Sequence, residues 1–391
     1  MHFFRLIWQQ KNRLYNGVMK EPKVALIHDN LVQNGGAEKT LELISKIFPN
    51  APIYTGIYKP DHFTPYLNSR KIIHIKNALL QKLPKYFSPI MPLVFENYNL
   101  RDFDIILSDS SCWAKGVLTR PDQLHISYIH TPPRFLYHYS VESTKRNAWY
   151  FKPVVPFLDM LLRAWDYSAA QRPNYLIANS IEVQKRIKKF YGRESTVINP
   201  PIETGGDPVL GNAGEGEYYF AWGRVVAYKN FDAIVKAFNI NGLPLIISGA
   251  GPQVEYLKSI AKDNVKIMDR VWDDEKYEMI KKSLGVINAV KDEDFGIVPP
   301  EAMAFGKPVL VHKSGGHSET VIEGVNGEFF EDPEPEEFSK KIVEFDKNVK
   351  SKKYDPIKVS ESVKHLSAER FTEEYKSFVM EKWELHQREN A

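Results

Sequence analysis

The sequence predicts an α/β protein made of two doubly wound, parallel-sheet domains that face each other across a cleft. Short, almost continuously apolar runs alternate with segments of helical period, which is typical of parallel strands covered by helices on both faces. This alternation stops in a glycine-rich stretch and then begins again. At 391 residues the chain is also longer than one hydrophobic core usually supports.

The first half of the chain contains four predicted strands. The first, KVALIHD (23–29), is followed by the turn NLVQNGG and an amphipathic helix. The others lie in DIILSDS (104–110), HISYIH (125–130) and NYLIANS (174–180). Each ends in small, polar or histidine residues, as strands do where their carboxyl ends open onto a site. A helix within 180–192 is expected, with Ser180 as its N-cap and Gly192 just beyond its last turn.

Residues 203–217 contain five glycines in fifteen positions and almost no apolar residues, which predicts a linker. Beyond it the alternation restarts. Strands are expected within 218–224, 244–251, 265–269, 284–290 and 308–313, and helices within 230–240, 253–262 and 274–283, from Pro299, and within 317–324. The predicted organisation is an extension over 1–21, a first domain over 22–202, the linker, a second domain over 218–369, and a terminal helix over 370–391.

Composition narrows the classes of function. The formal net charge of +3 is too small to predict nucleic-acid binding. The single cysteine, Cys112, cannot form an internal disulfide, which fits a reducing cytoplasm, and we expect it to be a small buried hydrophobe rather than a nucleophile. The sequence contains no run of 18 apolar residues, so we do not predict a membrane-spanning helix. The first 20 residues carry four basic and no acidic side chains, which fits either a membrane-surface or targeting segment or a weakly ordered extension before a natural start at Met19.

Two glycine turns precede predicted helices. NGGAEKT places Gly35 and Gly36 after the first strand, and SGAGP places Gly249 and Gly251 after a strand of the second half. Glycines let a backbone approach a ligand, and a helix N-terminus offers free N–H groups to an anion. Both stretches also fit simple tight turns. Neither is the dinucleotide fingerprint, which argues against an oxidoreductase.

A basic pair lies on another loop before a helix. In WGRVVAYKN (222–230), Arg224 and Lys229 supply one forked donor and one point charge, a combination that suits a diphosphate. Two solvated surface cations are the alternative interpretation.

An acidic pair brackets a predicted turn. In EDFGIVPPEAMAFGKPVL (293–310), Glu293 and Glu301 lie on either side of a proline pair that suits a helix N-terminus. We expect both carboxylates to point into the cleft, where they could accept hydrogen bonds from a polyhydroxylated ligand such as a sugar nucleotide. A solvated loop glutamate and a helix-dipole glutamate would explain the same two residues without a ligand.

In this order along the chain, the motifs resemble glycosyltransferase family 4. EDFGIVPPEAMAFGKPVL with the later GGHSE looks like the signature of these retaining nucleotide-sugar transferases, whose two-domain fold is GT-B. GRVVAYKN resembles the family's phosphate-binding stretch, and NGGAE its first glycine loop. LPKYFSPIMPLVFE, SDSSCWAKGV and YIHTPPRFLYH resemble a subgroup rich in bacterial O-antigen and exopolysaccharide mannosyltransferases. The resemblance covers about residues 22–385.

The resemblance implies a role for each matching residue. Glu301 would bind the nucleotide ribose, and Glu293 would face the donor sugar together with the backbone N–H groups of Phe295 and Gly296. Arg224 and Lys229 would hold the diphosphate, with Gly36 approaching from the other domain. His130 would contact the donor sugar, although a histidine at a strand end is more often structural. The last helix would pack back on the first domain.

The implied mechanism is retaining transfer. The leaving diphosphate would be stabilised electrostatically while the acceptor hydroxyl attacks from the same face, and the departing phosphate oxygen would take the proton. We expect no cofactor and no metal. The strings DFD (102–104) and DED (292–294) match a D-x-D motif, but the first precedes a strand and the second overlaps the E-x₇-E loop.

The acceptor leaves a weaker signal. Residues 70–95 contain five basic side chains, no acidic side chain, and the apolar stretch YFSPIMPLVF. This combination suits the surface of an anionic membrane and a lipid-linked glycan acceptor. A basic surface helix followed by a core segment is the alternative. We also expect Lys115 to contact an acceptor phosphate.

Several other functions stay open. The subgroup resemblance favours GDP-mannose as the donor, with UDP-sugars as the alternative. A sugar-nucleotide epimerase or a phosphorylase could share the fold, although we find no clear lysine for the pyridoxal phosphate of a phosphorylase. A catalytically silent, membrane-associated partner subunit is the non-enzyme alternative, and the presence of both His130 and Lys229 argues against it.

Overall fold

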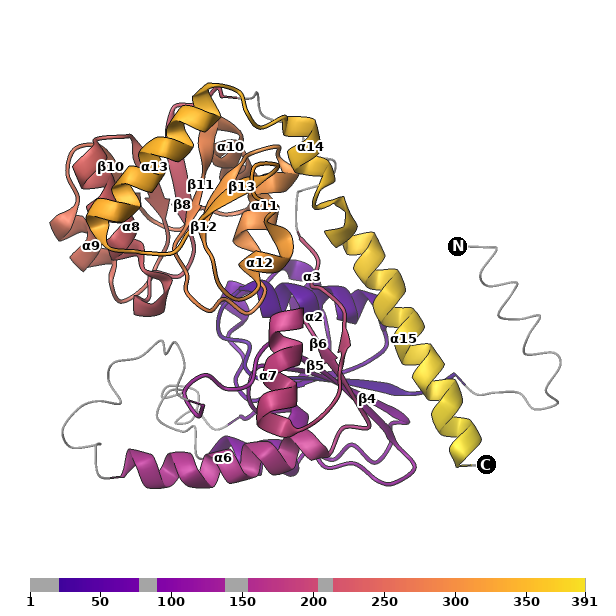
Figure 1. The fold of residues 1–391 in the computed structure, drawn as a ribbon. Helices are drawn as coiled ribbons and strands as arrows, with labels where there is room; N and C mark the ends of the chain where they lie inside the picture. The colour runs from indigo at the N-terminus through magenta and orange to yellow at the C-terminus, as the bar shows by residue number, and fades with distance from the viewer. Residues whose placement is uncertain (1–20, 77–89, 138–153, 203–213, 391) are drawn as a thin grey trace.

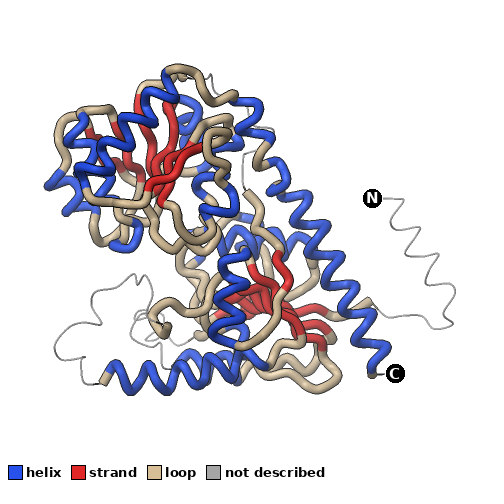
Figure 2. Tube along the Cα trace, viewed as in Figure 1, coloured by secondary structure: helices blue, strands red, loops and turns tan. Residues whose placement is uncertain are grey.

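The computed structural model describes residues 21–76, 90–137, 154–202 and 214–390, which form two α/β lobes (Figure 1). Figure 2 shows a sheet inside each lobe, with helices around it. The predicted α/β class with two parallel-sheet domains is confirmed. Residues 1–20 of the predicted extension and most of the predicted linker lie outside the described residues.

The first domain contains a seven-stranded parallel sheet in the order β3-β2-β1-β4-β5-β6-β7 among the residues described. Its strands are β1 (Val24–His28), β2 (Ile53–Thr55), β3 (Ile72–Ile73), β4 (Ile105–Ser110), β5 (Leu124–Ile129), β6 (Tyr175–Ala178) and β7 (Thr196–Val197). Its helical segments are α2 (Gly36–Ile47), η1 (Pro60–His62), α3 (Pro65–Asn68), α5 (Met91–Glu96), η3 (Ala114–Gly116), α6 (Val155–Gln171) and α7 (Ile181–Tyr191).

The second domain contains a six-stranded parallel sheet in the order β10-β9-β8-β11-β12-β13. Its strands are β8 (Tyr218–Trp222), β9 (Leu245–Ser248), β10 (Val265–Met268), β11 (Ser283–Asn288), β12 (Val309–His312) and β13 (Gly327–Phe330). Its helical segments are η5 (Ala227–Lys229), α8 (Phe231–Asn241), α9 (Val254–Ile260), α10 (Asp273–Lys282), α11 (Val298–Ala304), α12 (His317–Thr320), α13 (Pro335–Lys350), α14 (Pro356–Glu361) and η6 (Lys364–Leu366).

Each predicted strand is present, because apolar runs of this kind are buried on both faces of a parallel sheet: every residue of β4, β5 and β11 is buried. The prediction missed β2, β3, β7 and β13, which have two to four residues each and give little periodic signal. It also made α12 too long. That helix is a single turn, because Val321 already has an extended backbone.

Both strand orders reverse direction beside a central strand. In the first domain the reversal lies between β1 and β4, and in the second it lies between β8 and β11. Ligands of doubly wound sheets bind beyond the carboxyl ends of strands at such a switch point. The fold therefore predicts a site on the loops that follow β1, β4, β8 and β11.

The last helix, α15 (Ala368–Glu389), leaves the second domain and lies along the first (Figure 1). Phe371, Tyr375 and Val379 are fully buried in the core cluster that contains Leu26 and Tyr128. Ser367 caps the helix by accepting a hydrogen bond from the Arg370 N–H. Part of the first domain's core is thus supplied by the end of the chain.

Within the described ranges, no helix has both the length and the apolar character needed to cross a bilayer. Cys112 is half-buried and packs against a core cluster of the first domain, where its burial raises the pKa of the thiol. It is therefore less buried than we expected from the sequence.

Candidate active site

The loop between β11 and α11 carries the acidic motif. Asp292 and Gly296 both have left-handed backbone conformations, with φ of 57° and 84°. A Cβ atom at position 296 would lie 2.8 Å from Cδ2 of His317, so glycine is required there. Phe295 is buried. The loop therefore turns tightly against the first residue of α12.

Glu293 lies in a group of positive charges. Its side chain is 13% exposed. Burial by itself raises the pKa of Glu293, but the charges of Lys229, His317 and Arg134 outweigh burial and lower this pKa below its ordinary value. Glu293 is therefore ionised at neutral pH. These three groups come from three separate segments of the chain, one of which belongs to the first domain.

Glu301 has a different environment. It lies in the first turn of α11, as predicted, but it is only 4% exposed. Its Oε2 accepts a hydrogen bond at 3.0 Å from Nζ of Lys276, which is also buried. The two carboxylates of the motif therefore have different partners. The role of Glu301 toward a ribose stays a prediction.

The predicted basic pair lies on the loop after β8. Lys229 ends η5, and its Nζ lies 3.4 Å from the position that a Cβ of Gly223 would occupy. Its charge acts directly on Glu293. Arg224 is half-buried on the same loop, two residues after the end of β8. Basic and acidic motifs 64 or more positions apart are thus brought to one edge of the second sheet, at its switch point.

Gly249 and Gly251 are needed for loop packing. A Cβ at Gly249 would lie 2.1 Å from the carbonyl oxygen of Gly223, and one at Gly251 would lie 2.2 Å from that of Val225. The Val225 N–H also donates to the Ala250 carbonyl at 3.0 Å. These glycines let two neighbouring loops touch each other, so the structure explains them without a ligand.

The first glycine loop meets the second domain. A Cβ at Gly36 would lie 2.5 Å from Cδ1 of Ile297, next to Gly296. Arg270 donates to the Asn34 carbonyl across the same boundary. The Gly35 N–H donates at 2.8 Å to Oε2 of Glu38. Binding of an anion at this helix N-terminus stays a prediction.

His130 is held by a carboxylate that the sequence analysis did not single out. Asp109 Oδ1 is 2.5 Å from His130 Nε2, and Asp109 Oδ2 is 2.8 Å from His28 Nδ1. The strand register places His28 opposite Asp109 at the carboxyl ends of β1 and β4. The strand-end position of both residues was visible in the sequence, but their pairing was not.

Charge explains the state of this cluster. Burial by itself raises the pKa of Asp109, but the charge of His130 and the hydrogen bonds from both histidines lower it to about 2. Burial by itself lowers the pKa of His28, but the hydrogen bond to Asp109 and the charges of Asp109 and Glu38 raise it overall. An ionised carboxylate therefore bridges two histidines.

Two arginines of the first domain form ion pairs and hydrogen bonds with the acidic loop of the second domain. Arg134 contacts Asp294 Oδ2 at 2.8 Å, and Arg186 contacts Asp294 Oδ1. Both also donate to the Asp292 carbonyl, at 3.2 and 3.0 Å. Arg134 lies in the HTPPR motif, but no role for it was predicted from the sequence.

A second contact fixes the domains beside this loop. Glu319 of α12 accepts hydrogen bonds at 2.8 Å from the N–H groups of Ile181 and Glu182. The Ser180 hydroxyl donates at 2.6 Å to the Asp294 carbonyl. The N-terminus of α7 is therefore capped partly by the other domain, which holds the two switch points face to face.

The expected contact of Lys115 with an acceptor phosphate is wrong. Its side chain is 1% exposed, and Nζ lies 2.6 Å from Asp166 Oδ1 of α6. Tyr137 donates to the other oxygen of Asp166 at 2.9 Å. A buried ammonium needs such a partner, and the pair leaves Lys115 facing the interior.

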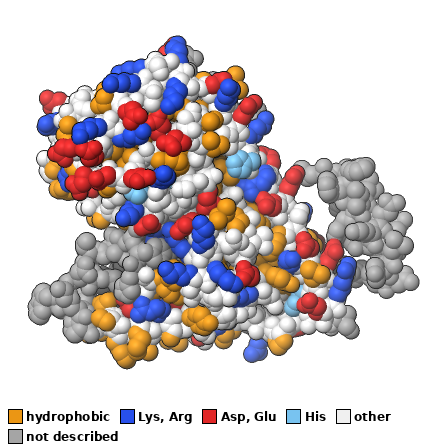
Figure 3. All heavy atoms as spheres, viewed as in Figure 1, with side chains coloured by type: hydrophobic (Ala, Val, Ile, Leu, Met, Phe, Trp, Pro, Cys, Tyr) orange, Lys and Arg blue, Asp and Glu red, His pale blue; other side chains and the backbone are white. Residues whose placement is uncertain are grey.

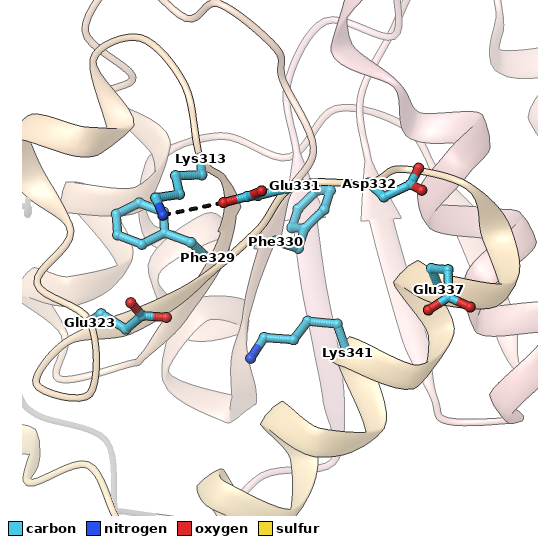
Figure 4. Close-up of a pocket in the computed structure, with 8 residues that line it drawn as sticks. All are labelled: Lys313, Glu323, Phe329, Phe330, Glu331, Asp332, Glu337 and Lys341. Atoms are coloured by element: carbon cyan, nitrogen blue, oxygen red, sulfur yellow. Dashed lines mark hydrogen bonds and ion pairs between the residues drawn. The ribbon is translucent and has the colours of Figure 1, made fainter.

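An open hollow of about 300 Å³ lies elsewhere, beside β13 and α13 (Figure 4). It contains side chains of both charges, including the Lys313–Glu331 pair at 3.2 Å. None of the predicted site residues lines it. We therefore place the candidate site where the charged loops of both domains converge, rather than in this hollow.

Comparison with known structures decides the fold. The chain superposes on a sucrose-phosphate synthase from Thermosynechococcus elongatus with a TM-score of 0.69 and 14% identity, covering 93% of this chain and 100% of that one. It superposes on Anabaena Alr3699/HepE in complex with UDP-glucose with a TM-score of 0.67 and 16% identity, covering 92% and 100%. The fold is GT-B. This confirms the expected architecture, in which the two switch points of a GT-B protein face each other.

Sequence comparison adds a family match within the second half of the chain. Residues 207–355 match the family model Glycosyl transferases group 1. Two proteins of Methanocaldococcus jannaschii, the uncharacterized glycosyltransferases MJ1178 and MJ1607, are 29% identical over 145 residues and 30% identical over 114 residues. These alignments cover 36% and 27% of this chain, and 41% and 29% of the length of the relatives. Loops with the acidic and basic motifs lie inside the matched domain.

Proposed function

We propose that this protein is a retaining glycosyltransferase that transfers mannose from GDP-mannose to a glycan or lipid-linked glycan acceptor in surface polysaccharide synthesis. The observation that carries the proposal is the convergence of Glu293 and Lys229 at the switch point of a domain that matches Glycosyl transferases group 1. The donor would bind on these loops, and the acceptor would enter from the first domain.

The side chains divide the work by charge. Arg224 and Lys229 would bind the diphosphate and stabilise the negative charge that develops as it leaves. Glu293 is ionised and would accept hydrogen bonds from hydroxyls of the donor sugar. His130 would contact the sugar from the opposite domain, in the orientation that Asp109 sets. The acceptor hydroxyl would attack from the face of the leaving diphosphate and pass its proton to a phosphate oxygen.

A UDP-sugar is the second candidate donor. It is favoured by the solved structures of the same fold that carry UDP or UDP-glucose. Their identity to this chain is 15% and 16%, so they bear on the fold and not on the base that this chain selects.

The lipid-linked acceptor is supported by the surface of α6. Phe157, Met160 and Leu161 are 59%, 50% and 49% exposed, whereas Asp159 and Asp166 of the same helix are buried. Figure 3 shows hydrophobic side chains along the margin of the first domain where Figure 1 places α6. A helix that turns its carboxylates inward and its apolar residues outward suits the surface of a membrane.

The neighbouring α5 extends this apolar surface. The two helices are joined through Glu96, which accepts a hydrogen bond at 2.7 Å from Nε1 of Trp165, and Leu93 of α5 is 61% exposed. α5 belongs to the predicted membrane segment 70–95, of which 77–89 lies outside the described residues. Arg70 of that segment donates instead to backbone carbonyls, including that of Ala51 at 2.9 Å. We therefore propose that an anionic bilayer is contacted by α5 and α6.

A thermal-shift screen tests the donor. We expect GDP-mannose to raise the unfolding midpoint more than UDP-glucose or UDP-GlcNAc at equal concentration, because a ligand at 100 times its Kd stabilises by about 2.7 kcal/mol. A larger shift with a UDP-sugar would replace the donor and keep the transferase. If no nucleotide sugar shifts the midpoint, the proposed function is wrong. An epimerase would be recognised by conversion of the donor without any acceptor.

A further inference from the structure

Arg134 of the first domain reaches into the donor site of the second. It follows β5 and His130, and its side chain is 11% exposed. Its guanidinium lies 3.8 Å from Glu293 Oε1, 2.8 Å from Asp294 Oδ2, and 3.2 Å from the Asp292 carbonyl. It also lies 5.0 Å from the centre of the Tyr228 ring, on the loop that carries Lys229. One side chain therefore touches both loops of the proposed donor site.

From this geometry we infer that Arg134 is a positioning residue, which orients the Glu293 carboxylate for the donor sugar and does so only while the two domains are in contact. The inference rests on the proposed function. A planar guanidinium can meet a carboxylate, a carbonyl and an aromatic ring at once, which the ammonium of a lysine cannot do. The contact between the two domains would thus complete the site.

The charges around Glu293 support this role. Three groups face it from three elements: the cations Lys229 of η5 and Arg134 of the first domain, and His317 of α12, whose pKa is lowered by burial so that it carries a charge only in acid. The neighbouring Asp294 carboxylate is itself paired with Arg134 and Arg186. Burial by itself raises the pKa of Glu293, and the charges of Lys229, His317 and Arg134 lower it. Removal of Arg134 should therefore let Glu293 take up a proton at a higher pH.

Arg186 offers a matched control. It also belongs to the first domain and contacts the same loop, through the Asp294 carboxylate and the Asp292 carbonyl. Within its own helix it forms an ion pair with Glu182. Replacing Arg186 weakens the contact between the domains without taking away the guanidinium that lies beside Glu293. The comparison of the two arginines separates the positioning of Glu293 from the contact between the domains as such.

The first test is kinetic, with the full chain and the donor identified by the screen. For Arg134→Ala we expect kcat to fall about 10- to 100-fold, with a smaller change in KM for the donor, because a misplaced group acts mainly on the transition state. The acidic limb of the pH profile of kcat should move to higher pH. Arg134→Lys should move the acidic limb part of the way back toward its wild-type pH. Arg186→Ala should leave the limb at its wild-type pH. Equal effects of Arg134→Ala and Arg186→Ala on kcat and on the limb would overturn the inference.

The second test does not depend on activity. Unfolding midpoints of Arg134→Ala, Glu293→Ala and the double variant form a double-mutant cycle, and residues in contact give shifts that do not add. We expect a non-additive result for this pair and an additive one for Arg186→Ala with Glu293→Ala. Additive shifts for Arg134 and Glu293 would overturn the inference even in an active enzyme. If the coupling is present but no nucleotide sugar binds, the proposed function fails and the donor role of Arg134 fails with it.

Discussion

Replacement of Asp109 by asparagine would remove the ionised carboxylate that bridges His28 and His130. The amide keeps the shape of the side chain but carries no charge and cannot accept hydrogen bonds through both of its terminal atoms. Both histidines are nearly buried, at 3% and 9% exposure, so solvent cannot easily replace the lost partner. We expect a loss of stability and a misoriented His130.

The size of the loss follows from the carboxylate. The cluster lowers the pKa of Asp109 from 3.8 to about 2. At 1.36 kcal/mol per pH unit, this difference corresponds to roughly 2 kcal/mol of unfolding free energy at pH 7. Because the folded-state pKa lies below the unfolded one, this stabilisation is present above about pH 4 and is lost as the pH falls toward 2.

His28 sets the opposite limit. Its pKa is raised in the folded state, so its contribution is complete below the ordinary value of 6.5 and is lost as the pH rises through the raised value. The stability difference between the wild type and Asp109→Asn should therefore be largest in mildly acidic to neutral solution and smaller on either side.

Urea unfolding followed by tryptophan fluorescence at several pH values measures this difference. Asp122→Asn is the control, because that carboxylate is 63% exposed and its change should stay within about 0.5 kcal/mol. The reasoning is refuted if Asp109→Asn matches the wild type at pH 7, or if the difference between them grows as the pH falls from 4 to 3.

Three further predictions concern separate parts of the molecule. Glu293→Ala and Lys229→Ala should each lower turnover by about 100-fold while the fold stays intact, and transfer at the wild-type rate would show that the residue has no such role. Lys115→Ala should cost about 3–5 kcal/mol in urea unfolding, because it leaves a buried carboxylate unpaired, and a cost below 1 kcal/mol would contradict the buried ion pair. Phe157→Ser on α6 should weaken sedimentation with anionic vesicles about tenfold while unfolding stays unchanged, and equal sedimentation would argue against membrane contact at α6.

The fold was largely legible in the sequence. Apolar runs such as KVALIHD form central strands, and Ser180 and Gly192 cap the two ends of the predicted helix α7. These features have a local cause, since the period of burial and the capping chemistry are fixed by the backbone geometry of each element.

The partners of the charged residues were decided only by the tertiary structure. Asp109 pairs with His28, 81 positions away, and Arg134 reaches the Asp292 carbonyl, 158 positions away. Lys115 illustrates the opposite outcome, because a cation that looked available is buried against Asp166. The sequence determined which charges each loop carries. Strand register and the packing of two domains determined which of them meet, because an ion pair depends on distance in space and leaves no periodic trace along the chain.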